Sequence, residues 1–190
     1  MTKSSDTFKG PTTASPLPVP LQALQAEHQL ILRVLHHLDA SIEDFATNAQ
    51  HHVPIIRAYL DFSQHYTDRF HHAKEEEVLF SYFDSRESII TAMQADHVLG
   101  RKWIHTATEA LIVGDHQTVA MCLRSYRNML AQHIQTEHAQ LFPWIFHRLT
   151  HAQIEEIGTR FAAIDTHFQN EKKHFEDWAN RLANPDALTR

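Results

Sequence analysis

The chain has 190 residues, of which 43% are hydrophobic and 21% charged. This composition supports a folded core and excludes a wholly disordered, collagen-like or charge-driven chain. The formal net charge of −6 argues against nucleic acid or an anionic membrane as the main partner. A single cysteine, Cys122, excludes an internal disulfide and a cysteine-based zinc or iron–sulfur site. Without a signal-peptide pattern or a run of 18 apolar residues, we expect a cytoplasmic protein.

Glycine and proline are scarce, with 4 and 7 residues, and four of the prolines fall within the first 20 positions. Few chain breakers remain for the rest, which favours a few long helices over many short strands. We therefore divide the chain into a flexible Ser/Thr/Pro-rich arm (1–19), a helical bundle (20–149), a C-terminal helical extension (150–184) and a tail (185–190).

Hydrophobic residues at steps of three and four predict the first helix, from Leu21 to Phe45. A polar stretch at 47–52 ends it. Pro54, expected in a first turn, opens a second helix that runs to about Phe83. Asp84 and Ser85 are expected to cap a third helix, whose apolar stripe extends to Leu111.

Gly114 and Asp115 are expected to end the third helix and cap the fourth, whose stripe runs from Val119 to Trp144. Thr150 with Gln153 forms a capping-box pattern, which predicts a fifth helical stretch ended by Asn184–Pro185. Short connections make successive helices antiparallel. The predicted fold class is therefore all-α: an up-down-up-down four-helix bundle with an additional C-terminal helix, either outside the bundle or at an interface.

Histidine is unusually frequent, with 17 residues. His28, His97 and His133 each lie within an otherwise apolar helical stripe. Taken alone, each is as well explained by a core histidine that makes a hydrogen bond. Glu137 is harder to explain, because it shares a helix face with leucines and an ionised carboxylate in a dry core needs a compensating cation or hydrogen bonds.

The pattern then repeats in the two halves of the bundle. His71 and Glu75, like His133 and Glu137, are four residues apart, which places both side chains on one helix face. A Leu-Phe pair follows each glutamate by four and five residues, and an acidic residue precedes both His28 and His97. A pseudo-twofold arrangement of two helix pairs would bring four imidazoles and two carboxylates together at the middle of the bundle. Six such donors suit two metal ions, with the glutamates as bridges.

These residues resemble the hemerythrin-like (HHE cation-binding) domains over about residues 20–149. The resemblance implies a non-haem di-iron centre, although imidazole and carboxylate ligands also suit manganese or zinc. Carried over by position, the family's metal ligands fall on the following residues: His28, His71, Glu75, His97, His133 and Glu137.

Two departures separate the chain from the oxygen-carrying hemerythrins. Arg101 stands where they have a second histidine of the third helix, and His138 stands where they have an aspartate. The chain is therefore more similar to the six-ligand subgroup, which includes proteins of iron-centre repair, catalase-like proteins and an iron-sensing domain. Simple oxygen carriage is disfavoured.

The polar residues next to the predicted ligands are expected at the surface or rim of the site rather than within it. Glu27 and Asp96 are expected to point away from the site as surface or cap charges, and Lys74 and Arg101 are placed in salt bridges at its rim rather than beside it as counter-charges. Gly100 is read as a close-packing position rather than a channel. The thirteen histidines outside the ligand set are expected mostly on polar faces.

Several functions stay open on the sequence alone. The first is a redox-active di-iron protein whose ligand is a diatomic molecule (O₂ or NO) or peroxide, in a stress response and with weak catalase-like activity as one form. The second is an iron sensor or donor whose metal occupancy controls stability or a partner. A bundle without metal is the third, and a ferritin-like enzyme is set aside because Glu-x-x-His spacing occurs only at Glu171–His174. The protein is expected to be a monomer or homodimer.

Overall fold

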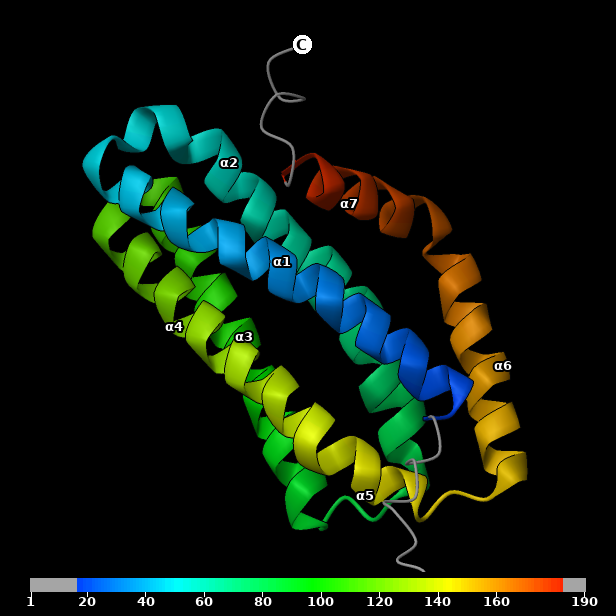
Figure 1. Cartoon of the computed structure of the whole chain (residues 1–190). Helices are drawn as coiled ribbons and strands as arrows, with labels where there is room; N and C mark the ends of the chain where they lie inside the picture. The colour runs from blue at the N-terminus through cyan, green and yellow to red at the C-terminus, as the bar shows by residue number, and fades with distance from the viewer. Residues whose placement is uncertain (1–16, 183–190) are drawn as a thin grey trace, which may run out of the picture.

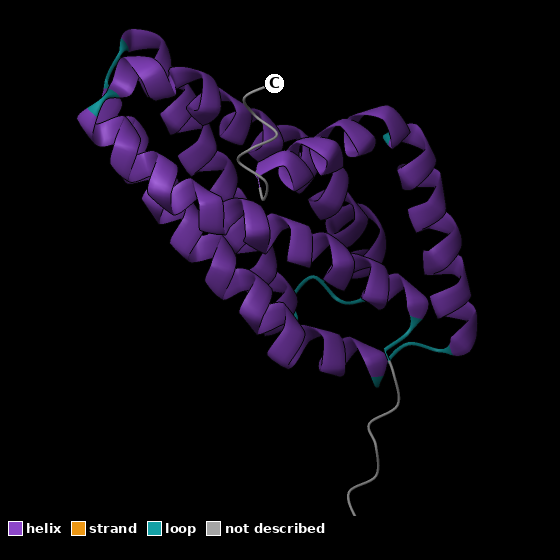
Figure 2. Cartoon of the chain, turned by 45° about the horizontal axis from the view of Figure 1, so that its top comes forward, coloured by secondary structure: helices purple, strands orange, loops and turns teal. Residues whose placement is uncertain are grey.

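The structure is a computed structural model that describes residues 17–182. The predicted tail lies outside these residues, as does most of the predicted N-terminal arm. The described part contains helices and short connections but no strand, which confirms the all-α fold class (Figure 2). No helix in this part is long and apolar enough to cross a membrane.

Four helical rods form the bundle (Figure 1). The first is α1 (Val19–Thr47), and the third is α3 (Ser88–Val113). The other two rods contain wide π-helical segments, which carry the label η. The second rod consists of α2 (Ala49–Asp61), η1 (Phe62–His72), η2 (Lys74–Leu79) and a 3₁₀ turn, η3 (Phe80–Tyr82). The fourth rod consists of α4 (His116–Thr136), η4 (Glu137–Leu141) and α5 (Phe142–Phe146).

The predicted boundaries hold where a side chain or glycine fixes them. Gly114 ends α3 in the left-handed conformation, at φ 77°, and the carboxylate of Asp115 accepts a hydrogen bond of 3.0 Å from the backbone N–H of Thr118. Thr150 and Gln153 form the expected capping box at the start of α6 (His151–His167). Each of these motifs satisfies helix-end groups that have no partner within the helix itself.

Three boundary predictions were wrong. Pro54 lies inside α2 rather than in its first turn, because the chain passes from α1 to α2 through a single non-helical residue, Asn48. Asp84 does not cap α3; its carboxylate instead accepts hydrogen bonds from the backbone and side chain of Arg86, and α3 begins at Ser88. The fifth stretch is two helices, since a break at Phe168 separates α6 from α7 (Gln169–Leu182).

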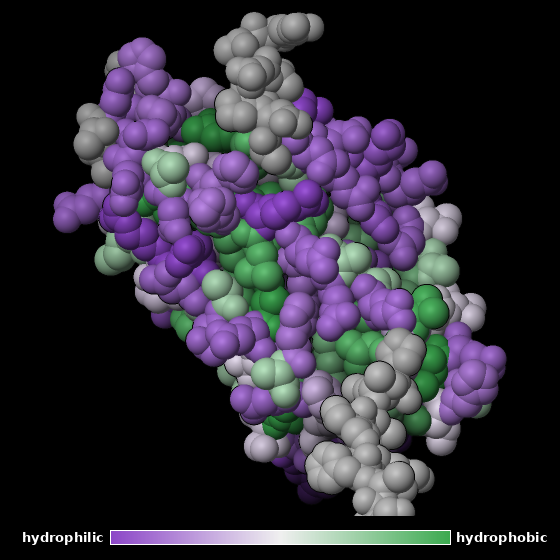
Figure 3. All heavy atoms as spheres, viewed as in Figure 1, coloured by the Kyte–Doolittle hydropathy of each residue, from purple (hydrophilic) through white to green (hydrophobic). Residues whose placement is uncertain are grey.

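Helices α6 and α7 lie along one side of the bundle (Figure 1). Helix α6 packs on η2 and α1, and α7 packs on η1 and α1. The extension thus packs outside the bundle against the first and second rods, which is one of the two placements expected from the sequence. Figure 3 shows that this face of the molecule carries mainly hydrophilic side chains, with hydrophobic side chains visible between them.

The apolar core is divided into two clusters along the bundle axis. One contains Ile31, Phe70 and Ile134, and the other contains Leu24 and Leu141, among further residues. His28 lies between Leu24 and Ile31 in the chain, and Glu137 lies between Ile134 and Leu141. The polar residues of the predicted site therefore form a layer with an apolar core at each end, which keeps bulk water away from them.

We expect Gly114→Ala to lower the free energy of unfolding by about 1 kcal/mol, because a Cβ is disfavoured at positive φ. Gly158→Ala in α6 is the matched control. A Cβ there would meet Pro20 Cγ at an ordinary contact distance of 3.6 Å, so this variant should be stabilised by roughly 0.5–1 kcal/mol. Urea denaturation of both variants measures the difference, and equal effects would contradict this account of Gly114.

Candidate metal centre

The site lies where the second and fourth rods depart from α-helical geometry. His71 belongs to the π-helical segment η1, Glu75 to η2, and Glu137 begins η4. The sequence predicted helices here but did not indicate this departure from α-helical geometry. π-Helical geometry is rare in proteins and is often found at functional sites. His28 and His97 project from the regular helices α1 and α3, and His133 from α4.

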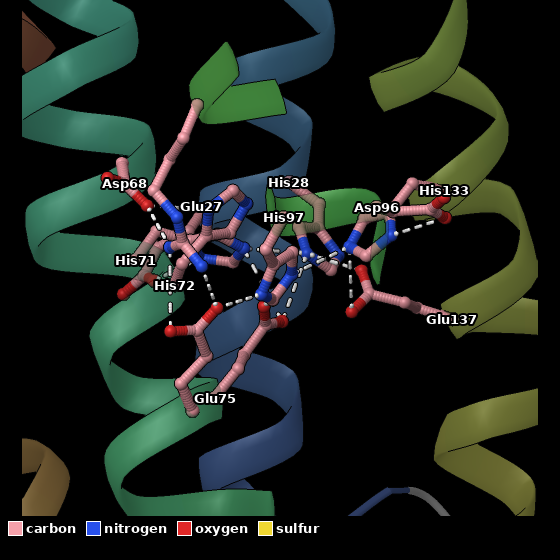
Figure 4. A network of polar contacts seen from close by, with 12 residues as sticks. Glu27, His28, Asp68, His71, His72, Glu75, Asp96, His97, His133 and Glu137 are labelled. Carbon is pink, nitrogen blue, oxygen red and sulfur yellow. Dashed lines mark hydrogen bonds and ion pairs between the residues drawn. The ribbon is translucent and has the colours of Figure 1, made fainter. Parts of the chain in front are cut away.

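The four histidines converge as two pairs in the buried layer (Figure 4). The Nε2 atoms of His28 and His71 lie 2.9 Å apart, and those of His97 and His133 lie 3.1 Å apart. All four side chains are at most 2% exposed. The helix arrangement expected from the repeated spacing thus brings these imidazoles together.

Two carboxylates connect the histidine pairs. Glu75 Oε1 lies 3.7 Å from His28 Nε2 and 3.5 Å from His71 Nε2, whereas its Oε2 lies 3.4 Å from His97 Nε2.

Glu137 repeats this arrangement from the opposite side. Its Oε2 lies 3.1 Å from His28 Nε2, and its Oε1 lies 3.3 Å from His133 Nε2. Each glutamate therefore directs one oxygen toward each histidine pair.

The other ring nitrogen of each histidine faces outward to a partner on a neighbouring rod. His71 Nδ1 lies 2.8 Å from Glu27, His97 Nδ1 lies 2.7 Å from Glu76, and His133 Nδ1 lies 3.2 Å from Asp96. A carboxylate accepts only, so each of these Nδ1 atoms carries the proton. The lone pair of the neutral ring then lies on Nε2, directed into the site.

The fourth histidine has a different outer partner. His28 Nδ1 lies 2.9 Å from Nε2 of His138, which is partly buried. Burial, and then the nearby charge of His28, lower the pKa of His138, so the neutral ring accepts the hydrogen bond. An imidazole thus takes the place that a carboxylate has at the other three histidines.

These outer partners form a closed ring around the bundle. Glu27, next to His28 on α1, supports His71 on the second rod, and Glu76, next to Glu75, supports His97 on α3. Asp96, next to His97, supports His133 on the fourth rod, and His138, next to Glu137, supports His28. The expectation that Glu27 and Asp96 point away as surface or cap charges was wrong. They turn away from their own neighbour but toward the histidine of the next rod.

Lys74 was also placed wrongly, because it is fully buried rather than at the rim, and its ammonium group donates to Glu27. Arg101 does lie at the rim. It is 40% exposed and bridges Asp68 at 2.7 Å and Glu76 at 2.8 Å.

The phenylalanines of the two Leu-Phe pairs pack against the histidine rings. The Phe80 ring stacks on His97 at 6.1 Å between centroids, and Phe142 stacks on His28 at 5.8 Å. The repeated motif thus places one aromatic ring against each histidine pair, as a pseudo-twofold arrangement requires.

His72 is a buried residue of the site that the sequence did not single out. Its ring stacks on His97, with centroids 3.8 Å apart and planes 15° from parallel, and its Nε2 is buried without a hydrogen-bond partner among the described residues. Two nearly parallel rings this far apart cannot both hold one ion in their planes at the about 2 Å of a metal–nitrogen bond. His72 therefore flanks His97 rather than sharing an ion with it. Because His71 and His72 are adjacent in the chain, no sequence pattern separated the role of one from that of the other.

Without a metal, protons on the histidines supply the positive charge of this layer. Burial alone would lower the pKa of His28, but hydrogen bonds with Glu137 and Glu75 outweigh it and raise that pKa to about 9. For His133, the charge of Glu137 and the hydrogen bond with Asp96 similarly overcome burial and raise the pKa to about 10. The carboxylates thus attract positive charge into the layer strongly enough to overcome desolvation.

The donor set fits a metal. Both oxygens of Glu75 and of Glu137 are buried, and the contacts given for them within the described residues are with Nε2 atoms of the site histidines at 3.1–3.7 Å. If those rings were neutral and no cation were present, burying the two carboxylates would cost several kcal/mol. Two groups of side chains each bring their donor atoms within 4.8 Å of one another. The first group is His28, His71 and Glu75, and the second is His72, Glu75, His97 and His133.

A helical bundle with buried imidazole and carboxylate donors at its centre defines a cation-binding protein of the four-helix type. The family model of the hemerythrin HHE cation-binding domain matches residues 19–145, and the chain belongs to this family. Comparison with curated proteins and with solved structures found no match.

We expect metal binding to the metal-free protein at pH 7 to release at least two protons, those of His28 and His133, because a ligating imidazole must be neutral and both pKa values lie above 7. A pH indicator in weak buffer measures this release. Since protons compete with the metal, apparent affinity should rise with pH, by about tenfold per unit for each proton released. Binding without proton release would show that these histidines are not the ligands.

Proposed function

We propose that this layer holds two iron ions, with His28, His71, Glu75, His97, His133 and Glu137 as the protein ligands. The observation that carries the proposal is that each of the two glutamates directs its separate oxygens toward separate histidine pairs. One ion between two such pairs would leave half of these donors without a partner. Two ions would use all of them, because each glutamate could then offer one oxygen to each ion.

Iron is favoured over other metals by the family to which the chain belongs, because the donors alone do not choose among metals. Imidazole and carboxylate without thiolate suit iron, manganese or zinc. Six ligands shared by two octahedral ions leave positions for a small external molecule. Manganese and zinc are the other outcomes that a metal analysis of the purified protein would report.

We further propose that the centre reacts with O₂, peroxide or nitric oxide, in oxidative or nitrosative stress or in the maintenance of iron centres. A pair of ferrous ions supplies two electrons to such a molecule. The chain contributes the rest: two apolar clusters that exclude bulk water, and an outer ring that fixes the tautomer and orientation of each histidine.

A small cavity supports access for such a molecule. It has a volume of about 160 Å³, lies between the second rod, α3 and α4, and is lined by Gly100, Arg101, Tyr126 and His72, among other residues. His72 separates it from His97. A Cβ on Gly100 would lie 3.0 Å from Met129 Cε and 3.4 Å from Tyr126, so the glycine serves close packing as well as lining this cavity.

An iron sensor or donor is the second candidate. The four buried oxygens of Glu75 and Glu137 favour it, because a layer that needs positive charge among its carboxylates makes metal occupancy a contribution to folding free energy. For either function, we propose a cytoplasmic location on the grounds of the single cysteine, and no nucleic-acid partner on the grounds of the net charge. We expect a monomer or homodimer.

Glu137→Ala should lose most of the bound iron while helix content is largely kept, because the variant removes one bridge but leaves the apolar clusters intact. Iron per chain after anaerobic purification and far-ultraviolet circular dichroism measure the two effects. Glu155→Ala removes a carboxylate that is 70% exposed and should bind iron like the parent protein. Unchanged iron content in Glu137→Ala would refute the assigned site.

Mixing the anaerobic ferrous protein with peroxide or nitric oxide separates the two candidate functions. We expect new near-ultraviolet and visible charge-transfer bands within seconds, or peroxide turnover, from a redox centre. Inert iron, together with a large fall in melting temperature on chelation, would instead support the sensor.

A further inference from the structure

One arm of the outer ring, which runs from Glu27 through Lys74 to Asp165 and Lys172, continues beyond the four-helix bundle. Glu27 is 6% exposed and uses its two oxygens differently: Oε2 faces His71 Nδ1 at 2.8 Å, and Oε1 accepts from the ammonium group of Lys74. The orientation of Glu27, and through it that of His71, therefore depends on where Lys74 is held.

Helix α6 holds Lys74 in place. The Lys74 Nζ atom donates to Asp165 Oδ1 at 3.2 Å and lies 5.6 Å from the centre of the Phe161 ring. Phe161 and Asp165 are four residues apart and so share one face of α6. On the bundle side the same ammonium group lies 4.2 Å from the Phe70 ring. The fully buried lysine is thus enclosed by aromatic rings and two carboxylates.

Helix α7 completes the charge balance of this arm. Lys172 donates to the same oxygen of Asp165 at 2.7 Å. Carboxylate and ammonium groups alternate from Glu27 through Lys74 and Asp165 to Lys172, so no charge of the arm lacks a counter-charge. Both α6 and α7 lie outside residues 19–145, the segment that the family model matches.

The other three histidines are supported from within the bundle. Their outer partners, Glu76, Asp96 and His138, belong to η2, α3 and η4. Within the described residues, the support of His71 is the one that reaches the C-terminal helices. Loss of this support should therefore affect the His28–His71 side of the centre more than the His97–His133 side.

We propose that Asp165 is a positioning residue of the metal centre, which acts through Lys74 and Glu27 on His71, so that the C-terminal helices complete the site. This rests on the proposed function in that His71 binds a metal. Without the carboxylate of Asp165, Lys74 loses one of its two anionic partners, and Glu27 must hold the buried ammonium group alone. The hydrogen bond from His71 Nδ1 then weakens. Residues that hydrogen-bond a ligating histidine directly, as Glu27 does, typically change metal affinity by roughly 10–100-fold when replaced. Asp165 acts through two intervening residues, so we expect its effect at the lower end of this range.

The test compares Asp165→Asn, Asp165→Glu and Asp177→Asn in the full-length chain. Asp177 is the matched control because it loses one exposed ion pair of the same extension, with Lys173 at 3.3 Å. Metal-free protein is titrated anaerobically with Co²⁺ alone, whose visible absorption bands report the geometry of its ligands. We expect Asp165→Asn to bind one of two Co²⁺ ions roughly tenfold more weakly, with shifted bands, and expect Asp165→Glu and Asp177→Asn to match the parent protein.

A merely structural role gives a different result. If Asp165→Asn lowers the urea midpoint of the metal-free protein but leaves Co²⁺ affinity and absorption unchanged, the inference fails while the proposed function stands. If the parent protein itself binds no Co²⁺ tightly, the proposed function fails and the inference fails with it.

Amide hydrogen exchange gives a second readout that does not depend on the absorption bands of Co²⁺. Coupling between two parts of a protein is reciprocal in free energy. Metal binding should therefore slow amide exchange in α6 of the parent protein, by roughly the same factor as Asp165→Asn weakens the metal. In Asp165→Asn this slowing should be lost, and equal protection of α6 in both proteins would overturn the inference.

Discussion

The main constraint on this structure is the mutual repulsion of the imidazole nitrogens and carboxylate oxygens in its buried polar layer. Each histidine that has a carboxylate at Nδ1 would, when its ring is neutral, direct its Nε2 lone pair inward, toward other lone pairs and toward the oxygens of Glu75 and Glu137. A buried layer of such donors is stable only when positive charge lies among them. In the metal-free protein, protons fill this role, which is why the pKa values of His28 and His133 are raised to about 9 and 10. A metal replaces these protons rather than entering a relaxed cavity.

The remainder of the bundle keeps this arrangement from relaxing. Apolar clusters on both sides of the layer fix the four rods and prevent the glutamates from reaching bulk water. The outer ring binds each rod to the next through one hydrogen bond per histidine, and Phe80 and Phe142 restrict the rings of His97 and His28 from the side. Binding energy that a flexible protein would spend on ordering its ligands is then available for holding the metal.

The sequence predicted the converging residues well and their supports poorly, for one geometric reason. Residues four apart on a helix share a face, so the two His-x-x-x-Glu pairs could be placed together without a structure. Glu27 and Asp96 each precede a predicted ligand by one residue, and adjacent residues on a helix point about 100° apart. That rotation directs them away from their own neighbour, and which rod they then meet depends on the packing. The π-helical turns and the burial of Lys74 beneath α6 likewise arise from tertiary contacts that no local spacing encodes.

The outer ring also makes the two sides of the centre chemically unequal. A carboxylate at Nδ1 makes an imidazole a stronger donor at Nε2. His133 has such a partner in Asp96, and His97 has one in Glu76, which also pairs with Arg101. His71 likewise shares Glu27 with the ammonium group of Lys74, but His28 has only the neutral ring of His138. Under the proposed function, the ion beside His28 and His71 receives less electron density from its histidines, although the bridging glutamates serve both ions alike. Under the same proposal, this ion would be the more weakly held of the two, and its histidines lie on the side of the bundle that α6 and α7 cover.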